Sequence, residues 1–230
     1  MSAARPIRPK VIAIVPAAGS GRRLKVRTKK PFVLLKSKPI IAWTLAALQG
    51  CDAISEIIVA SEASCVRKLS ELVKRFRFNK VSDIIIGGST RFESVSNCLA
   101  EVGSSFDIVL VHDGARPFID DDTILESIKL ASKFGACIVA SRETDTVKYT
   151  DDTLFISKTL DRNHVFRAET PQVFKYEVIK RAYSVKSKNN ITDDASLVER
   201  LGLPVKILIG KNCNMKITTK DDIRIAEALL

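Results

Sequence analysis

The sequence predicts an α/β fold, with a mostly parallel sheet flanked by helices on both sides. Short β-branched runs alternate with segments of helical period, and these runs are apolar throughout, as in strands buried on both faces. Strand–helix–strand alternation with right-handed crossovers builds a doubly wound sheet. The chain has 230 residues, 46% of them hydrophobic, which is enough for one domain with a sizeable core.

The individual elements follow from this alternation. Strands are predicted at 10–15, 56–61, 83–88, 107–115, 135–141, 204–209 and 213–218. Helices are predicted at 39–50, 63–76, 90–102, 121–134, 175–187, 193–201 and 220–229. In the first of these helices Ile41, Leu45 and Leu48 share one face, as helical spacing requires. Residues 10–230 are expected to form a single domain, preceded by a flexible tail over residues 1–9.

Residues 142–163 depart from the alternation. Thr, Val, Tyr, Leu, Phe and Ile alternate with polar residues around a Thr-Asp-Asp turn, which indicates a β-hairpin. The segment has few large apolar residues to bury, so we expect an arm that leaves the globule. An isolated hairpin is marginally stable in water, and the simplest cover for its apolar side chains is a second copy about a two-fold axis. The apolar residues in question are Val147, Tyr149, Leu154, Phe155 and Ile156. A homodimer through this arm is therefore predicted.

Cysteine and hydropathy patterns limit the class of protein. The five cysteines are widely spaced, without a Cys-x-x-Cys pair, which indicates reduced core thiols in a cytoplasmic protein. With only two histidines, a catalytic thiol and a zinc site are both disfavoured. No apolar run approaches the ~20 residues that span a bilayer. The first ten residues lack the apolar segment of a secretory signal, so neither a membrane protein nor a secreted one is expected.

The net charge of +11 is concentrated at the N-terminal end. Residues 1–51 contain eleven Lys or Arg and no Asp or Glu, whereas the rest of the chain has 26 of each sign. This leaves two interpretations: a nucleic-acid-binding face or a pocket for a small polyanion. Aromatic residues make up only 6% of the chain, and no helix-turn-helix or RNA-binding signature occurs, so nucleic acid is the less favoured partner.

The basic end begins with a glycine loop, "PAAGSGRR" (16–23), directly after the first predicted strand. It is not a Walker A loop, and the dinucleotide fingerprint would need glycine where Leu24 stands. A tight strand-to-helix turn explains the glycines equally well. The basic neighbours Arg22, Arg23 and Lys30 favour phosphate, because backbone N–H groups and positive charge act together on it. One such charge ~4 Å from a phosphate gains roughly 4 kcal/mol at an effective dielectric constant of 20.

Four further stretches lie at or after predicted strand ends. "GGSTRFESV" (87–95) offers glycines and hydroxyls at a helix start, where ordinary N-capping is the alternative. "HDGARP" puts Asp113 after a buried strand, where it could hold a metal, a sugar hydroxyl or a helix cap. "TLDRN" places Arg162 at the base of the arm, and "NMKITT" puts Lys216 in a strand. Taken alone, an ordinary exposed arginine is the alternative for Arg162, and a surface lysine is the more common interpretation of Lys216.

Taken in order, the motifs "PAAGSGRR", "KKPF", "HDGARP", "DTVK", "TLDRN", "TPQ", "TDDAS" and "NMKITT" resemble the 2-C-methyl-D-erythritol 4-phosphate cytidylyltransferase family. The resemblance covers residues from about 10 to 230. It implies a Rossmann-like nucleotidyltransferase fold with a protruding β-arm and a dimer formed through it. It also implies the reaction of CTP with methylerythritol phosphate to give the CDP-alcohol and pyrophosphate. The implied cofactor is Mg²⁺, held largely by the CTP phosphates.

The resemblance also assigns roles to residues. Arg23 and Lys30 would stabilise charge at the α-phosphate in the transition state, while Arg162 and Lys216 would position the substrate phosphate. The nucleotide would lie against Ala17, Ala18, Gly19, Gly21, Gly87 and Ser94. Residues near sugar, metal or methylerythritol phosphate would be Asp113, Arg116, Thr146 and Thr192, with Asp113 as the expected metal ligand. The arm would carry Thr146 and Arg162 close to the partner's active site.

One departure from the family concerns the catalytic lysine. The family usually has Pro-Lys-Gln before an aromatic residue, whereas here the run is Lys29-Lys30-Pro31-Phe32. Lys29 is therefore an adjacent competitor for the role assigned to Lys30. A ribitol 5-phosphate cytidylyltransferase, which shares the architecture and most nucleotide motifs, is the nearest alternative. "HDGARP" and "TLDRN" favour the isoprenoid enzyme over it.

The chemistry of this reaction agrees with the composition. The nucleophile is already an anionic phosphate oxygen, so no general base is needed, and few histidines are expected. The obstacle is bringing a phosphate dianion onto a triphosphate. Catalysis must then come from positioning and from electrostatic stabilisation by Arg, Lys and Mg²⁺.

Overall fold

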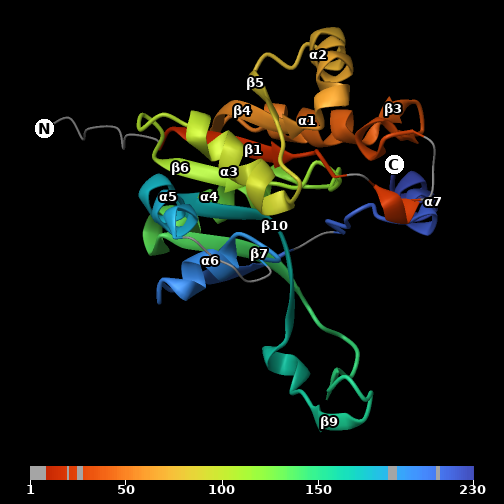
Figure 1. Ribbon diagram of the computed structural model, residues 1–230, viewed down its shortest axis with the longest axis vertical. Helices are drawn as coiled ribbons and strands as arrows, with labels where there is room; N and C mark the ends of the chain where they lie inside the picture. The colour runs from red at the N-terminus through yellow and green to blue at the C-terminus, as the bar shows by residue number, and fades with distance from the viewer. Residues whose placement is uncertain (1–8, 20, 25–27, 186–190, 211–212) are drawn as a thin grey trace, which may run out of the picture.

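The computed structural model describes residues 9–19, 21–24, 28–185, 191–210 and 213–230. Within these ranges the central feature is a seven-stranded sheet in the order β11-β7-β10-β6-β1-β4-β5 (Figure 1). Its strands are β1 (Val11–Pro16), β4 (Ile54–Ser61), β5 (Val81–Ile86), β6 (Ile108–Val111), β7 (Ala136–Arg142), β10 (Phe166–Lys175) and β11 (Lys206–Ile209). The predicted tail over residues 1–9 lies outside the described residues, apart from Pro9.

The α-helices cover both faces of the sheet, which confirms the predicted fold class. They are α1 (Ile40–Gly50), α2 (Val66–Arg75), α3 (Arg91–Glu101), α4 (Asp121–Phe134), α5 (Tyr176–Ser184), α6 (Ala195–Arg200) and α7 (Lys220–Leu229). Side chains of α1, α2 and α4 form one core with the sheet, and those of α3, α5 and α6 form another on the opposite face. A third, smaller core joins α7 to the two-stranded ribbon of β2 (Leu34–Leu35) and β3 (Lys38–Pro39).

Strand β1 shows why the apolar runs are continuous. Val11, Ala13 and Val15 point into one core, whereas Ile12 and Ile14 point into the other, because successive side chains of a strand alternate in direction. All five are essentially inaccessible to solvent. Each such buried Val or Ile side chain contributes about 1.5–3 kcal/mol relative to an exposed one. A strand in this position therefore needs apolar residues throughout.

The mostly parallel arrangement is confirmed, but one central strand is antiparallel. β1 pairs in parallel with β4 and β6, and β7 pairs in parallel with β11. β10 lies between β6 and β7 and runs antiparallel to both. Sequence patterning missed this strand, because it is interrupted by polar residues and a proline in "ETPQ". β10 pairs with β6 and β7 because of its position in the sheet, and not because its own residues alternate between apolar and polar.

Two other expectations about strands were wrong. Residues 213–218 form no strand, since their backbone makes isolated bonds, such as that from the Ile217 amide to the Ala115 carbonyl at 2.9 Å. The run at 83–88 was expected to be buried on both faces. β5 instead forms one edge of the sheet, and Ile86 is 57% exposed.

Helix starts follow the expected capping chemistry. The Thr90 side chain accepts a hydrogen bond from the Glu93 amide at the start of α3, and the Asp120 side chain does the same for the Thr123 amide at α4. Helix α7 begins with a capping box, in which Thr219 and Asp222 each accept a hydrogen bond from the other's backbone amide. These local signals fix where the helices start. For α3 the start lies at the edge of the site described below.

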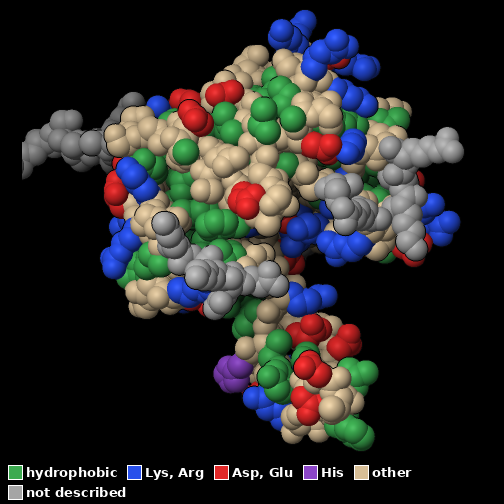
Figure 2. All heavy atoms as spheres, in the orientation of Figure 1, with side chains coloured by type: hydrophobic (Ala, Val, Ile, Leu, Met, Phe, Trp, Pro, Cys, Tyr) green, Lys and Arg blue, Asp and Glu red, His purple; other side chains and the backbone are tan. Residues whose placement is uncertain are grey.

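The predicted hairpin is present as an arm that projects from the body (Figure 1). β7 and β10 leave the sheet side by side, and beyond them β8 (Lys148–Thr150) pairs antiparallel with β9 (Ile156–Thr159). Apolar side chains lie at the outer end of the arm, where Leu154 is 81% and Phe155 78% exposed (Figure 2). Among the described residues, no helix has the length and apolar character needed to cross a membrane.

Candidate active site

A cavity of ≈ 710 Å³ opens at the carboxyl ends of the parallel strands. Ala17 follows β1, Glu62 follows β4, Gly88 follows β5 and Asp113 follows β6, and all four line it. Ligands in doubly wound sheets bind at this edge, because the loops after the strands converge there. The volume is within the usual range of about 300–1,000 Å³ for sites that hold small molecules.

The glycine loop forms one wall of the cavity. Its backbone continues from β1, with the Ala17 amide bonded to the Ala60 carbonyl at 2.8 Å. Gly21 has φ +64°, a backbone conformation that residues with a side chain rarely adopt. A Cβ atom built on it would lie 2.7 Å from Cβ of Lys30. Glycine is therefore required here so that the loop can pack directly against Lys30. Ser20 and the side chain of Arg22 lie outside the described part of the chain.

The two adjacent lysines of this wall have different surroundings. Nζ of Lys29 donates to both carboxylate oxygens of Glu62, at 2.8 and 2.9 Å, and the hydroxyl of Ser64 donates to the same carboxylate at 2.9 Å. The Lys30 side chain makes no hydrogen bond or ion pair with any described residue, although the Lys30 carbonyl accepts from the Val33 amide at 3.2 Å. Burial lowers its pKa to about 8, and the positive charges of Lys216 and Arg23 contribute. Lys30 is thus a partly desolvated cation whose charge no ion pair within the described residues balances.

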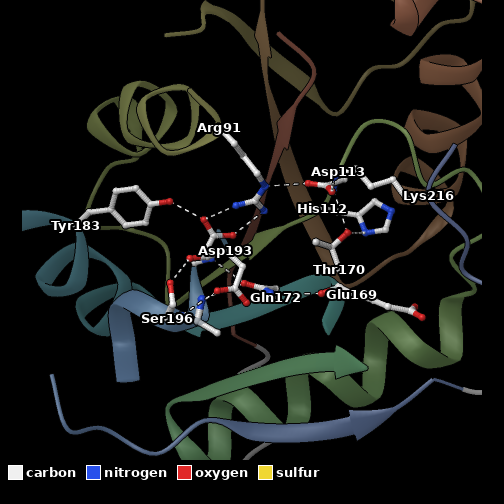
Figure 3. Close-up of polar contacts among 12 residues, drawn as sticks. Arg91, His112, Asp113, Glu169, Thr170, Gln172, Tyr183, Asp193, Ser196 and Lys216 are labelled. Atoms are coloured by element: carbon white, nitrogen blue, oxygen red, sulfur yellow. Dashed lines mark hydrogen bonds and ion pairs between the residues drawn. The ribbon is translucent and has the colours of Figure 1, made fainter. Parts of the chain in front are cut away.

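A chain of ion pairs forms the opposite wall (Figure 3). Arg91, at the first position of α3, donates through Nε to Oδ1 of Asp113 at 3.0 Å. Its two terminal nitrogens donate to the two carboxylate oxygens of Asp194, at 2.9 and 2.8 Å. Nζ of Lys216 lies 2.5 Å from Oδ2 of Asp113. Although burial disfavours the charged form, the two cations hold the pKa of Asp113 well below its usual range.

His112 lies behind this wall and is held neutral. Its Nε2 faces the carbonyl oxygen of Arg116 at 3.0 Å, and because a carbonyl only accepts, this nitrogen carries the proton. Its Nδ1 then accepts from the hydroxyl of Thr170 at 3.1 Å, and the same hydroxyl accepts from the Asp113 amide. Complete burial lowers the pKa of His112 to about 4. The histidine therefore fixes the Asp113 backbone and is not placed to act as a base on a ligand.

The charges of the cavity do not cancel. The basic side chains that line it are Arg23, Lys29, Lys30, Arg91 and Lys216. Three of them are paired with carboxylates, namely Lys29, Arg91 and Lys216. Among the described residues, Arg23 and Lys30 have no carboxylate partner. The cavity therefore presents two uncompensated positive charges beside a glycine loop, which suits a polyphosphate ligand.

Most of the predicted site residues meet in this cavity. Those that line it are Ala17, Ala18, Gly19, Gly21, Arg23, Lys30, Ser94, Asp113 and Lys216. Gly88 lines it in place of the predicted Gly87, and its amide faces Oγ of Ser94 at 3.2 Å. Gly87 has a packing role, because a Cβ atom there would lie 2.5 Å from Cβ of Ala18.

Besides Gly87, four predicted residues lie outside the cavity lining. Arg116 is buried behind the cavity, where it donates to the Asn214 carbonyl at 2.5 Å and pairs with Glu169 at 3.8 Å. Thr146 and Arg162 lie on the arm, and Arg162 donates to the Thr144 carbonyl at 3.0 Å. Thr192 is exposed just before α6. Within a single chain these groups are not assembled with Lys30.

Sequence reasoning missed Arg91, Glu62 and Asp194. Arg91 stands inside the motif "GGSTRFESV", so its position after a strand end was a usable signal. Its partner Asp194 is 103 residues further along the chain, and no local pattern joins the two. Glu62 follows β4 directly, which is the same kind of position that drew attention to Asp113.

The donor set for a metal ion is small. Among the described residues, no group of three or more His, Cys, Asp or Glu side chains could hold one. Asp113 contributes one ionised carboxylate, and both of its oxygens already accept from cations. Mg²⁺ is commonly bound by one or two carboxylates together with substrate phosphates. The residues present fit a metal that is held mainly by a triphosphate, with Asp113 beside it.

Comparison with known proteins identifies the family. Residues 11–230 match the family described as 2-C-methyl-D-erythritol 4-phosphate cytidylyltransferase. A protein of that name from Clostridium acetobutylicum is 43% identical over 221 residues, covering 95% of this chain and 96% of the relative. One from Syntrophus aciditrophicus is 41% identical over 227 residues, covering 97% of each.

Solved structures give the same result. The crystal structure of 4-diphosphocytidyl-2C-methyl-D-erythritol synthase from Anaerococcus prevotii has a TM-score of 0.84 at 30% identity, covering 96% of this chain and 98% of that one. A 2-C-methyl-D-erythritol 4-phosphate cytidylyltransferase from Thermus thermophilus has a TM-score of 0.76 at 27% identity, covering 94% and 96%. The cavity with its two uncompensated cations thus lies in the fold of these enzymes, and the chain belongs to the 2-C-methyl-D-erythritol 4-phosphate cytidylyltransferase family.

Proposed function

We propose that this protein transfers the cytidylyl group of CTP to 2-C-methyl-D-erythritol 4-phosphate, in the non-mevalonate route to isoprenoid precursors. The products are 4-diphosphocytidyl-2-C-methyl-D-erythritol and pyrophosphate. The observation that carries the proposal is the pair of uncompensated cations, Arg23 and Lys30, beside the glycine loop. Family membership supplies the identity of the two substrates.

In the proposed mechanism, the phosphate of methylerythritol phosphate attacks the α-phosphorus of CTP in line with the departing pyrophosphate. Its oxygen is already anionic, so no side chain has to remove a proton. Arg23 and Lys30 meet the negative charge that develops on the α-phosphate, and preorganised cations of this kind stabilise a transition state strongly. The carboxylates and His112 around the site stay out of proton transfer, since they are either ion-paired or neutral and buried.

Residues of the cavity also have proposed binding roles. The backbone of Ala17, Ala18 and Gly19 and the Gly88–Ser94 side would hold the nucleotide, because these groups line the wall next to the cations. Lys216 would position the phosphate of the second substrate. Mg²⁺ would supply charge neutralisation on the triphosphate when bound, with Asp113 as the nearest carboxylate.

A homodimer is part of the proposal. The apolar end of the arm is exposed in the single chain, and Arg162 and Thr146 lie on the arm, away from the cavity. A two-fold partner would cover the apolar end and bring these residues to the neighbouring site. We also propose a cytoplasmic location, on the basis of the cysteine pattern. We propose no role in binding nucleic acid, since the cavity accounts for the charge of the glycine loop.

Pyrophosphate release by the purified protein is the direct test. With CTP and Mg²⁺, pyrophosphate should appear when methylerythritol phosphate is added, and not with ribitol 5-phosphate or without an acceptor. Equal or better turnover with ribitol 5-phosphate would move the assignment to the alternative substrate. Release without any acceptor would indicate CTP hydrolysis and would contradict the proposal.

A further inference from the structure

A continuous series of polar contacts connects helix α5 to the cavity (Figure 3). The hydroxyl of Tyr183 lies 2.5 Å from Oδ1 of Asp194, which pairs with Arg91; Arg91 pairs with Asp113, and Asp113 with Lys216. We propose that Asp194, held by Tyr183, is a positioning residue for the transfer reaction: it fixes Arg91 and, through Asp113, the orientation of Lys216. This inference rests on the proposed function. It adds to that function three residues, Tyr183, Asp194 and Arg91, that position the reacting groups without being assigned a catalytic role.

The Asp194 carboxylate is held in one orientation. Its side chain has no exposed surface, and its two oxygens accept two parallel bonds from Arg91, at 2.9 and 2.8 Å, and one from Tyr183. Its backbone amide donates to Oε1 of Gln172 at 3.0 Å, as does the amide of Ala195. Paired Arg–carboxylate bonds of this kind fix geometry as well as charge, and burial strengthens them. A group held on this many sides can serve as a fixed reference point.

Arg91 connects the fixed Asp194 carboxylate to the cavity. Three nitrogens of its guanidinium are engaged, two with Asp194 and Nε with Asp113. Because the guanidinium is planar and rigid, fixing one edge on Asp194 also fixes the direction of the N–H that faces Asp113. Arg91 keeps 25% of its side-chain surface exposed and lines the cavity. Without Asp194 it would be free to turn toward the triphosphate.

Lys216 depends on the other end of the series. Its ammonium group is a point charge on a flexible stem with no preferred direction of its own. The bond to Oδ2 of Asp113 gives it one, while Oδ1 of the same carboxylate is held by Arg91. A shift of Arg91 therefore turns Asp113 and displaces the Lys216 ammonium from the position proposed for the substrate phosphate. A misplacement of about 1 Å near the reacting groups can lower a rate by ~10²-fold.

Helix α5 offers a matched pair of tyrosines for the test. Tyr183 stacks on Phe92, with ring centroids 4.9 Å apart and planes at 3°, so Tyr183→Phe keeps the packing and removes only the hydroxyl. Tyr176, at the other end of the same helix, donates to the Val102 carbonyl at 3.1 Å and has no contact with the series. Each substitution removes one largely buried phenol hydroxyl from the same element. They differ in whether that hydroxyl reaches Asp194.

The experiment measures kcat, both KM values and Tm for the wild type, Tyr183→Phe, Tyr176→Phe and Asp194→Asn. We expect Tyr183→Phe to lower kcat by about five- to tenfold with little change in KM for CTP, since it loosens one bond to a charged group. Asp194→Asn should lower kcat by ~10²-fold. Tyr176→Phe should shift Tm by a similar amount to Tyr183→Phe and keep the wild-type kcat.

Two results would overturn the inference. One is an unchanged kcat in Tyr183→Phe, and the other is an equal fall in Tyr176→Phe, which would make the effect one of general stability. If Asp194→Asn fails to fold, the two tyrosine variants still decide the matter. A wild type without cytidylyl transfer would instead contradict the proposed function itself, so the two failures can be told apart.

Discussion

Lys29 and Glu62 form an ion pair at the cavity, with Nζ of the lysine 2.8 Å from Oε1 of the carboxylate. The pair occupies the charge of Lys29, and Lys30 next to it remains without a carboxylate partner among the described residues. The two adjacent lysines therefore differ in their contacts: Lys29 ties the loop to the residue that follows β4, and Lys30 lines the cavity without a carboxylate partner in the described part of the chain. This difference favours Lys30 over Lys29 for the proposed role at the α-phosphate.

The first prediction concerns these two lysines. Lys30→Ala should lower kcat by roughly 10²–10³-fold, because it removes a charge that acts mainly in the transition state. Lys29→Ala should have a mild effect, since an exposed ion pair contributes at most about 1 kcal/mol. Steady-state kinetics with saturating CTP provides the measurement. A large loss in Lys29→Ala together with a small one in Lys30→Ala would reverse the assignment.

The second prediction concerns pH. Burial lowers the pKa of Lys30 in the free protein to about 8, so the lysine loses its charge as the pH rises through that value. Because kcat/KM reports groups of the free enzyme, kcat/KM for CTP should fall as the pH rises through about 8. Lys30→Arg, although less active, should show no fall in this range, since arginine stays protonated. A flat wild-type profile, or the same fall in Lys30→Arg, would contradict this explanation.

The third prediction concerns Gly21. Gly21→Ala should lower both stability and kcat, because its backbone has φ +64° and the new Cβ atom would lie 2.7 Å from Cβ of Lys30. Gly202→Ala is the matched control: its φ is +71°, but no atom lies within 4 Å of the new Cβ position. Each should lose about 1–2 kcal/mol of stability from backbone strain. Only Gly21→Ala should lose activity, and an unchanged kcat there would show that the loop does not hold Lys30.

Much of the fold and the site was predictable from the sequence, for identifiable reasons. The strands that lead to the site have their own signature, since both faces of β1 are buried and every residue in it must be apolar. Helix α4 runs from Asp121 to Phe134, as the helical spacing of its apolar residues predicted. Ala17, Lys30 and Asp113 could be placed together because strand ends converge at one edge of a parallel sheet.

What the sequence could not predict depends on tertiary position. β10 lies between two strands and pairs antiparallel with both, although its own pattern is interrupted by polar residues. Residues 213–218 alternate as a strand would, yet they run past the site without a ladder. The pairing of Arg91 with Asp194 joins residues that are 103 positions apart. Such contacts are specified by the packed fold and by no local pattern.

The fourth prediction concerns the arm and the dimer. If Arg162 acts in the partner's site, mixing Arg162→Ala chains with Lys30→Ala chains should restore activity, because each mixed dimer then has one intact site. Random exchange of subunits should recover about a quarter of wild-type activity. No recovery after proven exchange would place Arg162 in the site of its own chain. A fully active monomer by light scattering at the assay concentration would rule out the dimer as the active form.

The central claim is that the phosphate of the second substrate attacks CTP directly, with cations as the only catalysts and no side chain as nucleophile or base. The stereochemical course at the α-phosphorus tests this most directly, using CTP made chiral there by sulfur substitution. A single in-line displacement inverts the configuration, so the account predicts inversion in the product. Retention would require two displacements through a nucleotide bound covalently to the protein, and that result would contradict the account.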